Sequence, residues 1–394
     1  RTGSQIMATF LLDLILYLFQ MGNYDVIVVG GGLAGLTAAL HLQLKKVHVA
    51  VFERQKYPHH KVCGEYLSKE VVPYLESLGV CLPKLNNIDR MLLSTENGRS
   101  ITTKLPLGGL GISRVHLDHA LYSQAVSTGV PVLQRTITSI EYSNSKFTVL
   151  DSKGAQYSAK FVVGAYGKRD GLDKNLQRSF IKGKSPWLGV KAHYKSTSFP
   201  SNLVAVHNFR GGYGGLSKTE TGAINFCYLV SYDSFKREKD LESFQQNVLC
   251  KNPYLKDFFE RSQMLFDKPM TIGQIAFGKK SAITNHIILC GDTAGLIHPF
   301  CGNGMAMAVH SAKIASQLIH RYFTDSNYKR QDLEKDYTTQ WQATYEKRLW
   351  MGRQLQSLLL SPAIFQRTMQ FLNYSPYIVS KLVQATHGKQ IDTV

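Results

Sequence analysis

A glycine-rich turn between a short apolar segment and a helical one constrains the fold of this chain more than any other feature. Residues 24–29 (YDVIVV) are apolar and largely β-branched, and the run stops at Gly30. Residues 33–43 then follow a helical pattern, and a second apolar run at residues 47–52 (VHVAVF) ends in Glu53. Runs of this length and composition are typical of strands buried in a parallel sheet. The segment therefore predicts a strand–helix–strand unit.

The spacing of the glycines in this turn is typical of a loop that binds a dinucleotide. Gly30 permits the tight turn, and Gly32, which lacks a Cβ atom, lets a pyrophosphate approach the backbone. Gly35 lets the helix lie close to the strand. The free N–H groups and the dipole at the start of the helix favour the phosphate charge. We expect the cofactor to bind here, at Gly30, Gly32, Leu33, Ala34 and Gly35.

The acidic residue that ends the second strand narrows the choice of cofactor. Glu53 lies 18 residues after Gly35, at a position where a carboxylate accepts hydrogen bonds from both hydroxyl groups of an adenosine ribose. The same carboxylate disfavours a 2′-phosphate. The turn is therefore expected to hold NAD or FAD and not NADP.

A second glycine turn, far along the chain, is expected to decide between these two cofactors. Residues 286–290 (HIILC) predict another buried strand, which runs into a Gly-Asp pair. Further on, a G-N-G-M sequence opens a helical pattern that covers residues 306–323. An NAD-dependent dehydrogenase has no use for such a turn so far from the first, so the pattern favours FAD. The residues that we expect this turn to contribute are Gly291, Asp292, Gly302, Asn303, Gly304 and Met305.

The composition excludes several classes of protein. With 44% hydrophobic residues, 19 Phe and 20 Tyr, the chain is expected to fold, and 394 residues suggest two or three domains. None of the six Cys forms a C-x-x-C pair, so we expect no metal site, no dithiol motif and no secreted disulfide scaffold. The formal charge of 46 − 28 = +18 comes without a basic run, so nucleic-acid binding is not expected. A basic surface or attraction to a membrane would explain this charge.

The pattern along the chain predicts a nucleotide-binding fold that a β-rich insertion interrupts. Apolar and polar residues alternate around residues 90–110 and 187–230, with Gly, Pro, Asn and Ser between the runs. Past residue 306 the pattern becomes helical. We expect an FAD-binding domain over residues 21–89, 111–180 and 283–330, a β-rich substrate domain over residues 90–110 and 181–282, and C-terminal helices over residues 331–394.

Both ends of the chain leave alternatives open. Residues 6–21 are apolar but interrupted by Asp13, and they are shorter than the roughly 20 apolar residues that a membrane span needs. We interpret residues 1–20 as a tag, an upstream extension or a peripheral anchor. The C-terminal helices mix aromatic residues with Lys and Arg. They are expected either to pack on the substrate domain or to contact a membrane that holds a lipid substrate.

Four segments occur in an order that points to one known superfamily. They read VIVVGGGLAGLTAALHL, FERQKYPHHKVCGEYLS, ISRVHLDHALYSQA and IILCGDTAGLIHPFCGNGMAMAVHSAKIA, and they extend from about residue 24 to about residue 320. Together they resemble FAD-dependent oxidoreductases of the para-hydroxybenzoate hydroxylase superfamily, and most of all its geranylgeranyl reductase-like branch. The resemblance implies an α/β fold: a Rossmann-like, GR2-type FAD-binding domain, a β-sheet substrate domain that interrupts it, and a C-terminal helical region. It also implies FAD bound non-covalently.

The resemblance further implies a place along FAD for each candidate residue. The glycines of the first turn would hold the pyrophosphate, with Glu53 on the adenosine ribose and Arg54 beside the adenine. Arg114 matches a family arginine that lies near the FAD phosphates. A guanidinium group is always charged and therefore suits a position beside phosphates. Asp292 would hold a ribityl hydroxyl. The helix start at Gly302–Met305 would bring N–H groups to the pyrimidine edge of the flavin, where a helix N-terminus stabilises negative charge by about 1–2 kcal/mol.

The segment Cys63-Gly64-Glu65 lies where the reductase branch has a K-x-C-G-G stretch, which its members place over the flavin. Cys63 is thus a weak catalytic candidate that would face the substrate as a polarising or redox-sensitive group. The alternative is a small residue in a tight turn. Lys61 and Glu65 are further candidates without an assigned role.

Two departures from the family pattern limit the transfer of function. Where relatives commonly have G-A-D-G, residues 164–167 read GAYG, which weakens the case for an NAD(P)H-dependent hydroxylase. Residues 213–218 (YGGLSK) stand where archaeal and plant-type reductases have an aromatic Y-x-W-x-F-P stretch, so a geranylgeranyl substrate is not implied. The W-x-W-x-I-P motif of the related halogenases is also missing.

These features predict an FAD-dependent enzyme that passes a hydride through flavin N5 to or from an apolar substrate held under the β-sheet. An isoprenoid, a lipid or a polyketide-like molecule would fit, and double-bond reduction is favoured. Two alternatives stay open: a flavin-dependent monooxygenase of an aromatic or polyketide-like substrate, and a non-catalytic FAD-binding protein. The electron donor is open, and NAD(P)H would bind only transiently because no second dinucleotide-binding unit is visible. We expect a cytoplasmic location, with peripheral membrane contact as an open alternative.

Overall fold

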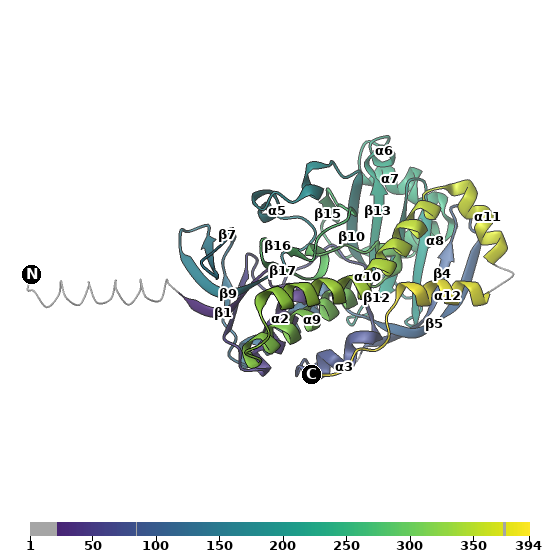
Figure 1. Cartoon of the computed structure of the whole chain (residues 1–394). Helices are drawn as coiled ribbons and strands as arrows, with labels where there is room; N and C mark the ends of the chain where they lie inside the picture. Colours follow the sequence, from purple (N-terminus) through teal and green to yellow (C-terminus); the bar gives the residue numbers. More distant parts are fainter. Residues whose placement is uncertain (1–21, 84, 373–375) are drawn as a thin grey trace, which may run out of the picture.

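The computed structural model describes residues 22–83, 85–372 and 376–394, and the extension predicted at residues 1–20 lies outside them. Within these residues, an eight-stranded and a nine-stranded β-sheet form the body of the molecule, and helices cover them (Figure 1). The predicted fold class is confirmed, because a Rossmann-like α/β unit is interrupted by a second sheet and followed by C-terminal helices.

The centre of the first sheet is parallel and contains the predicted strand–helix–strand unit. β1 (Asn23–Val29) pairs in parallel with β2 (Val49–Glu53) on one side and with β9 (Gln156–Gly164) on the other. β17 (Ile287–Leu289) is also parallel to β9. The carboxyl ends of β1 and β17 therefore meet at one edge of the sheet, although more than 250 residues separate them. The other strands are β6 (Val132–Gln134), β7 (Ile137–Ser143), β8 (Lys146–Asp151) and β16 (Ile283–Thr284).

Two helices begin near that edge and pack against each other. α2 (Leu33–Leu44) follows the first glycine turn, and α9 (Gly304–Thr324) follows the second. Small residues permit the close approach: the Ser316 hydroxyl of α9 donates to the carbonyl oxygen of Ala38 on α2 at 3.4 Å. The remaining short helices are η1 (Lys69–Val71), α3 (Val72–Ser77), α4 (Arg114–Ser127), α5 (Gly171–Asn175), η2 (Ser179–Lys182), η4 (Gly291–Thr293) and η5 (Pro299–Cys301).

The second sheet has an apolar face and a face that carries polar groups. In β10 (Trp187–Lys195), Leu188 and Val190 join a core cluster with Phe244 and Phe258 of two covering helices. The alternate residues of β10 point to the opposite face, because side chains alternate along a strand. The other strands of this sheet are β3 (Tyr66–Ser68), β4 (Asn86–Ser94), β5 (Ser100–Gly111), β11 (Leu203–Phe209), β12 (Gly212–Lys218), β13 (Ile224–Ser231), β14 (Gln263–Met264) and β15 (Met270–Gly273).

The strand β3 and the first residues of β4 belong to this second sheet, although they fall within residues 21–89, which we expected to be part of the FAD-binding domain. The chain therefore crosses to the second sheet before residue 90 and returns at the start of α4. The helices that cover the apolar face are α6 (Tyr232–Phe235), α7 (Leu241–Asn247), η3 (Leu249–Lys251) and α8 (Pro253–Glu260).

The C-terminal helices are α10 (Arg330–Leu359), α11 (Pro362–Leu372) and α12 (Pro376–Thr386). The first half of α10 packs along α9 beside the first sheet, whereas its end, α11 and α12 cover the other face of the second sheet (Figure 1). Their inner side chains, such as Leu359 and Met369, pack in one cluster with Val206 of β11. The helical tail therefore closes the molecule over this face. No helix in the described part of the chain combines the length and the apolar character that a membrane crossing requires.

Candidate functional site

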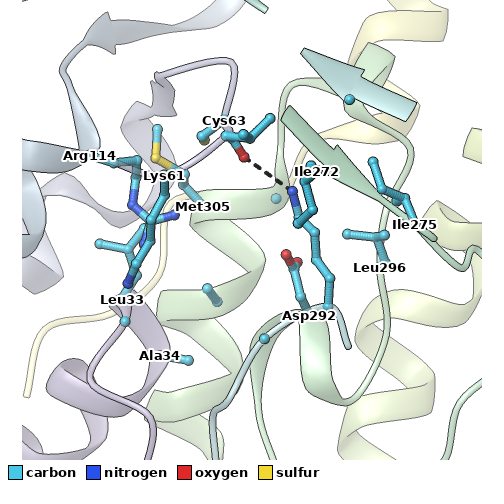
Figure 2. A pocket seen from close by; sticks show the side chains of 18 of the residues that line it. Leu33, Ala34, Lys61, Cys63, Arg114, Ile272, Ile275, Asp292, Leu296 and Met305 are labelled. Atoms are coloured by element: carbon cyan, nitrogen blue, oxygen red, sulfur yellow. Dashed lines mark hydrogen bonds between the residues drawn. The ribbon is translucent and has the colours of Figure 1, made fainter. Parts of the chain in front are cut away.

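A cavity of about 500 Å³ lies between the two sheets, at the edge where β1 and β17 end. Figure 2 shows Lys61, Leu33 and Arg114 on one side of it, and Ile272 and Leu296 on the other. All but two of the predicted cofactor-binding residues line it, and so do Lys61, Cys63 and Glu65. The two predicted residues that do not line the cavity are Gly35 and Asn303.

The first glycine turn has the geometry that its spacing predicts. Gly30 adopts a φ of +104°, which glycine tolerates best. A Cβ atom at Gly35 would overlap the carbonyl oxygen of Gly30, so the helix can lie on the strand only without a side chain there. Gly32 caps α2, and a Cβ atom at this position would lie 3.4 Å from Lys61 Nζ. The turn therefore leaves open space beside the start of α2.

Two cations stand next to this open space and share one buried carboxylate. Arg114 donates to both oxygens of Asp118 at 2.7 Å, and Lys61 Nζ lies 3.0 Å from the same carboxylate. Burial alone would raise the pKa of Asp118, but Arg114 and Lys61 outweigh burial and lower it. Two positive charges thus face one negative charge. The surplus positive charge and the N–H groups at the start of α2 suit a pyrophosphate. The sequence did not predict that Lys61 lies beside Arg114.

The end of β2 presents the predicted acidic residue to the cavity. The Glu53 carboxylate accepts hydrogen bonds from the backbone N–H groups of Gly31 at 2.7 Å and of Gln55 at 2.9 Å. These contacts fix its direction beside the glycine turn. Arg54 lines the same part of the cavity and pairs with Asp170 at 3.0 Å, while its side chain stays 56% exposed.

The second glycine turn lies directly against the first. Gly291 has a φ of +60°, and a Cβ atom there would lie 3.2 Å from the Cβ atom of Ala34. Asp292 follows and lines the cavity. Its carbonyl oxygen accepts a hydrogen bond at 2.8 Å from Lys280 Nζ, which also donates to the carbonyl oxygen of Lys168 at 2.8 Å. Burial lowers the pKa of Lys280 to about 8. The two turns thus meet in one site.

The start of α9 forms the far end of this line of residues. Gly302 adopts a φ of +65°, and together with Gly304 and Met305 it lines the cavity. The first turn of α9 carries no acidic residue, so its N–H groups keep a positive potential. Asn303 is 1% exposed, and its Nδ2 atom donates to the carbonyl oxygen of Thr386 at 3.1 Å. The side chain of Asn303 therefore contacts the C-terminal segment and does not line the cavity.

Side chains of the second sheet hold the loop that contains Cys63. Lys191 Nζ donates to the carbonyl oxygen of Lys61 at 3.0 Å, and Asn225 Nδ2 donates to that of Cys63 at 3.1 Å. The Ser217 hydroxyl donates to the carbonyl oxygen of Gly64 at 3.1 Å. Three strands of the second sheet (β10, β12 and β13) thus fix the backbone on which Cys63 sits.

Glu65 is the centre of this arrangement. Its carboxylate is fully buried and bonds to Lys191 Nζ at 2.5 Å, to His193 Nε2 at 2.6 Å and to the backbone N–H of Arg114 at 2.8 Å. Burial acts to raise the pKa of Glu65, but the bond from His193 and the charge of Lys191 lower it. Lys191 and His193 were not among the residues predicted from the sequence. The signal was their alternation with apolar residues along β10, which puts them on one face.

The part of the cavity beyond the loop is apolar. Ile272 and Ile275 face it in Figure 2, and Val206, Leu229 and Leu296 complete this wall. Cys63 is half-buried at its border, and the backbone N–H of Glu65 points to its Sγ atom at 3.5 Å. One continuous space thus joins a cationic glycine turn to an apolar wall.

Comparisons with known proteins agree with this geometry. The FAD binding domain family matches residues 23–326. The chain is similar to the digeranylgeranylglycerophospholipid reductase of Methanococcus aeolicus, with 23% identity over 83% of this chain and 84% of the relative.

Solved structures share the fold. A flavoprotein/dehydrogenase from Cytophaga hutchinsonii superposes with a TM-score of 0.75 at 16% identity and covers 92% of both chains. The flavin-dependent brominase Bmp2 superposes with a TM-score of 0.74 at 16% identity and covers 94% of both chains. The family match covers most of the chain, so it confirms the predicted cofactor. The chain belongs to the FAD binding domain family of flavoprotein oxidoreductases, and its cofactor is FAD.

Proposed function

We propose that the protein is an FAD-dependent reductase of an apolar substrate, in which one carbon of a double bond takes a hydride and the other takes a proton. When bound, FAD supplies the hydride chemistry. The observation that carries the proposal is the continuous cavity, which runs from the cationic glycine turn to the apolar wall of Ile272, Ile275 and Leu296. The similarity to a reductase of an isoprenoid lipid supports an apolar substrate.

The residues of the two turns have distinct parts in this proposal. The first turn, with Arg114 and Lys61, neutralises the pyrophosphate, and Glu53 binds the adenosine ribose. Arg54 lies beside the adenine. Asp292 binds the ribityl chain, and the N–H groups at the start of α9 stabilise negative charge at the pyrimidine edge of the flavin. What supports these parts is that Glu53 bonds to the first turn, that Lys61 lies beside Gly32 and that the second turn lies against the first, all around one cavity.

The loop of Cys63 would supply the protein's own chemistry. Cys63 lies at the border between the FAD-binding part and the apolar part, where its thiol can face a bound double bond. In the proposal, this thiol donates the proton that the reduction consumes, and solvent restores it. The bonds from Lys191, Asn225 and Ser217 keep the loop in place, so the thiol is oriented before substrate binds.

Anaerobic single-turnover measurement tests the proposal. The flavin is first reduced with dithionite and then mixed with candidate isoprenoid alkenes in the absence of O₂. A reductase returns the visible flavin absorbance to the oxidised form and yields the saturated product. A requirement for O₂, with labelled oxygen in the product, would instead identify a monooxygenase. Flavin that no substrate reoxidises without O₂, and that O₂ reoxidises without oxygenating any substrate, would support a non-catalytic FAD-binding protein.

A further inference from the structure

The outer face of the C-terminal helices carries apolar side chains that the proposed chemistry does not use. Trp350 on α10 is 51% exposed, Ile364 on α11 is 58% exposed and Phe371 on α11 is 68% exposed. Ile378 on α12 is 38% exposed. Four of the nine exposed large apolar side chains in the described residues thus fall between residues 350 and 378. The other five are scattered over the molecule: Leu44, Val126, Tyr254, Leu265 and Val394.

Helical spacing places basic residues beside these apolar ones. Lys347 and Arg353 lie three residues before and after Trp350 on α10, and all three are exposed. On α11, the exposed Arg367 lies between the two apolar residues, at spacings of three and four. Residues at these spacings are neighbours on a helix surface. We call these exposed residues of the three helices together the basic–apolar face: Lys347, Trp350 and Arg353 of α10, Ile364, Arg367 and Phe371 of α11, and Ile378 of α12.

The charged residues in this part of the sequence are all positive. Residues 347–391 contain six Lys or Arg and no Asp or Glu. The chain has 28 acidic residues in 394, so 45 residues would hold about three on average. A surface with this charge attracts partners that carry negative charge. A second copy of this chain would present the same positive charge, which disfavours self-association through the face.

The inner face of the same helices borders the cavity. Leu359, Phe365 and Met369 pack in one cluster with Leu229 and Leu296, which line the apolar wall. Figure 1 shows the end of α10, α11 and α12 covering the second sheet. The basic–apolar face thus lies on the outer side of the helical layer, whose inner side packs against residues of the apolar wall.

We infer that the basic–apolar face docks on a lipid bilayer with anionic headgroups. Helices that lie in a membrane interface carry aromatic and aliphatic residues among Lys and Arg, and basic residues there are attracted to anionic lipids. The inference rests on the proposed function, because an apolar substrate dissolved in a bilayer must reach the cavity. Docking brings the helical layer that borders the apolar wall to the membrane surface.

A fluorescence experiment on the full-length holoenzyme tests the docking. Of the three Trp in the chain, Trp341 is buried, Trp187 is half-buried and Trp350 is exposed. Vesicles with brominated acyl chains quench a tryptophan that enters the bilayer. We expect vesicles of equal parts phosphatidylcholine and phosphatidylglycerol to quench Trp350, and vesicles of phosphatidylcholine alone to quench it far less. The Trp350→Phe variant should lose the response.

A matched pair of variants locates the contact. Ile364→Ser with Phe371→Ser should lower binding to the anionic vesicles about tenfold or more, because two apolar side chains no longer leave water. Leu44→Ser with Val126→Ser changes side chains of similar exposure elsewhere and should leave binding unchanged. Vesicle binding without quenching of Trp350, equal binding by both double variants, or dimers that only the first pair abolishes would overturn the inference. If vesicles bind as expected but no alkene reoxidises the flavin, only the proposed function fails.

Discussion

Two glycines of the first turn, Gly32 and Gly35, meet different physical needs, although only two residues separate them. A Cβ atom at Gly35 would overlap the backbone of Gly30, so this glycine is needed for the helix to lie on the strand. A Cβ atom at Gly32 would meet only the ends of two long side chains, Lys61 at 3.4 Å and Arg114 at 3.7 Å. Packing therefore does not require a glycine at position 32, and we propose that Gly32 is needed for the cofactor to approach the backbone.

Alanine variants at the two positions should separate these needs. Gly35→Ala is expected to destabilise the protein by about 1–3 kcal/mol, as overpacking does. Gly32→Ala should leave the stability of the apoprotein within about 0.5 kcal/mol of the original but weaken FAD binding about tenfold, because the methyl group occupies the approach to the backbone. Urea unfolding and fluorescence titration with FAD measure the two effects. Equal effects of both variants on both quantities would contradict this assignment.

The buried ion pair of Glu65 and Lys191 is a second place where one side chain has a large effect on stability. Both side chains are fully buried, so Lys191→Met leaves a carboxylate in the interior with only part of its compensation. We expect a loss of about 3–5 kcal/mol in the free energy of unfolding. Lys195→Met, an exposed position on the same strand, should change it by less than about 0.5 kcal/mol. If Lys191→Met were as stable as the control, Glu65 would have to be neutral or otherwise paired.

The substitution Lys191→Met should also affect the loop that lines the cavity. Lys191 also holds the carbonyl oxygen of Lys61, so the loop of Cys63 is expected to loosen. An alkylating reagent should then label Cys63 faster in Lys191→Met than in the original protein under native conditions. Unchanged labelling would mean that Asn225 and Ser217 are sufficient to hold the loop.

At the scale of elements, the sequence predicted individual strands and helices, but it did not predict which distant strands and side chains pair. The structure places β1, β2, α2 and α9 within two residues of the predicted segments, because strand, turn and helix signals are contained in a few neighbouring residues. Strand β3 was not predicted, and its partner β5 lies more than 30 residues away, so no local pattern reveals the pairing. The same holds for Lys191 and Glu65, which are 126 residues apart.

Strand β11 gives a pH-dependent prediction at this scale. His207 is buried between β4 and the start of α8, where its Nδ1 atom shares a hydrogen bond of 2.7 Å with the Ser94 hydroxyl. Burial lowers the pKa of His207 to about 3. The unfolded chain therefore takes up a proton below pH 6.5 that the folded chain refuses, so stability falls as the pH drops from 6.5 toward 3.

The variant His207→Gln removes this one source of acid sensitivity. The free energy of unfolding of the original protein should fall when the pH is lowered from 7 to 5. In the variant this fall should be about 2 kcal/mol smaller, because one histidine contributes about 1.4 kcal/mol per pH unit. His116→Gln, at an exposed position on α4, should leave the pH dependence unchanged. Urea titrations at the two pH values measure the difference, and parallel curves for His207→Gln and the original protein would contradict the burial argument.

At the scale of the whole molecule, the site exists only because both sheets are in place. The sequence predicted residues beside the first sheet that line the cavity, but not that β10, β12 and β13 hold the loop of Cys63. It also did not show that Lys61 stands beside Arg114. These contacts depend on how one sheet docks on the other, which is a property of the packed core and not of any segment.

The cavity spans both glycine turns, so FAD should stabilise the fold more than a flavin that lacks the adenylate half. At 100 times its dissociation constant, a ligand adds about 2.7 kcal/mol to the free energy of unfolding. FMN and riboflavin, which cannot bridge both turns, should raise the melting temperature of the apoprotein less than FAD at equal concentration. Lys61→Met should weaken FAD binding about tenfold, or about 1.4 kcal/mol, and affect riboflavin less, because Lys61 lies beside Gly32, where we expect the pyrophosphate that riboflavin lacks. Lys56→Met, an exposed neighbour, serves as the control. Equal stabilisation by FAD and FMN would show that the first turn takes no part in binding.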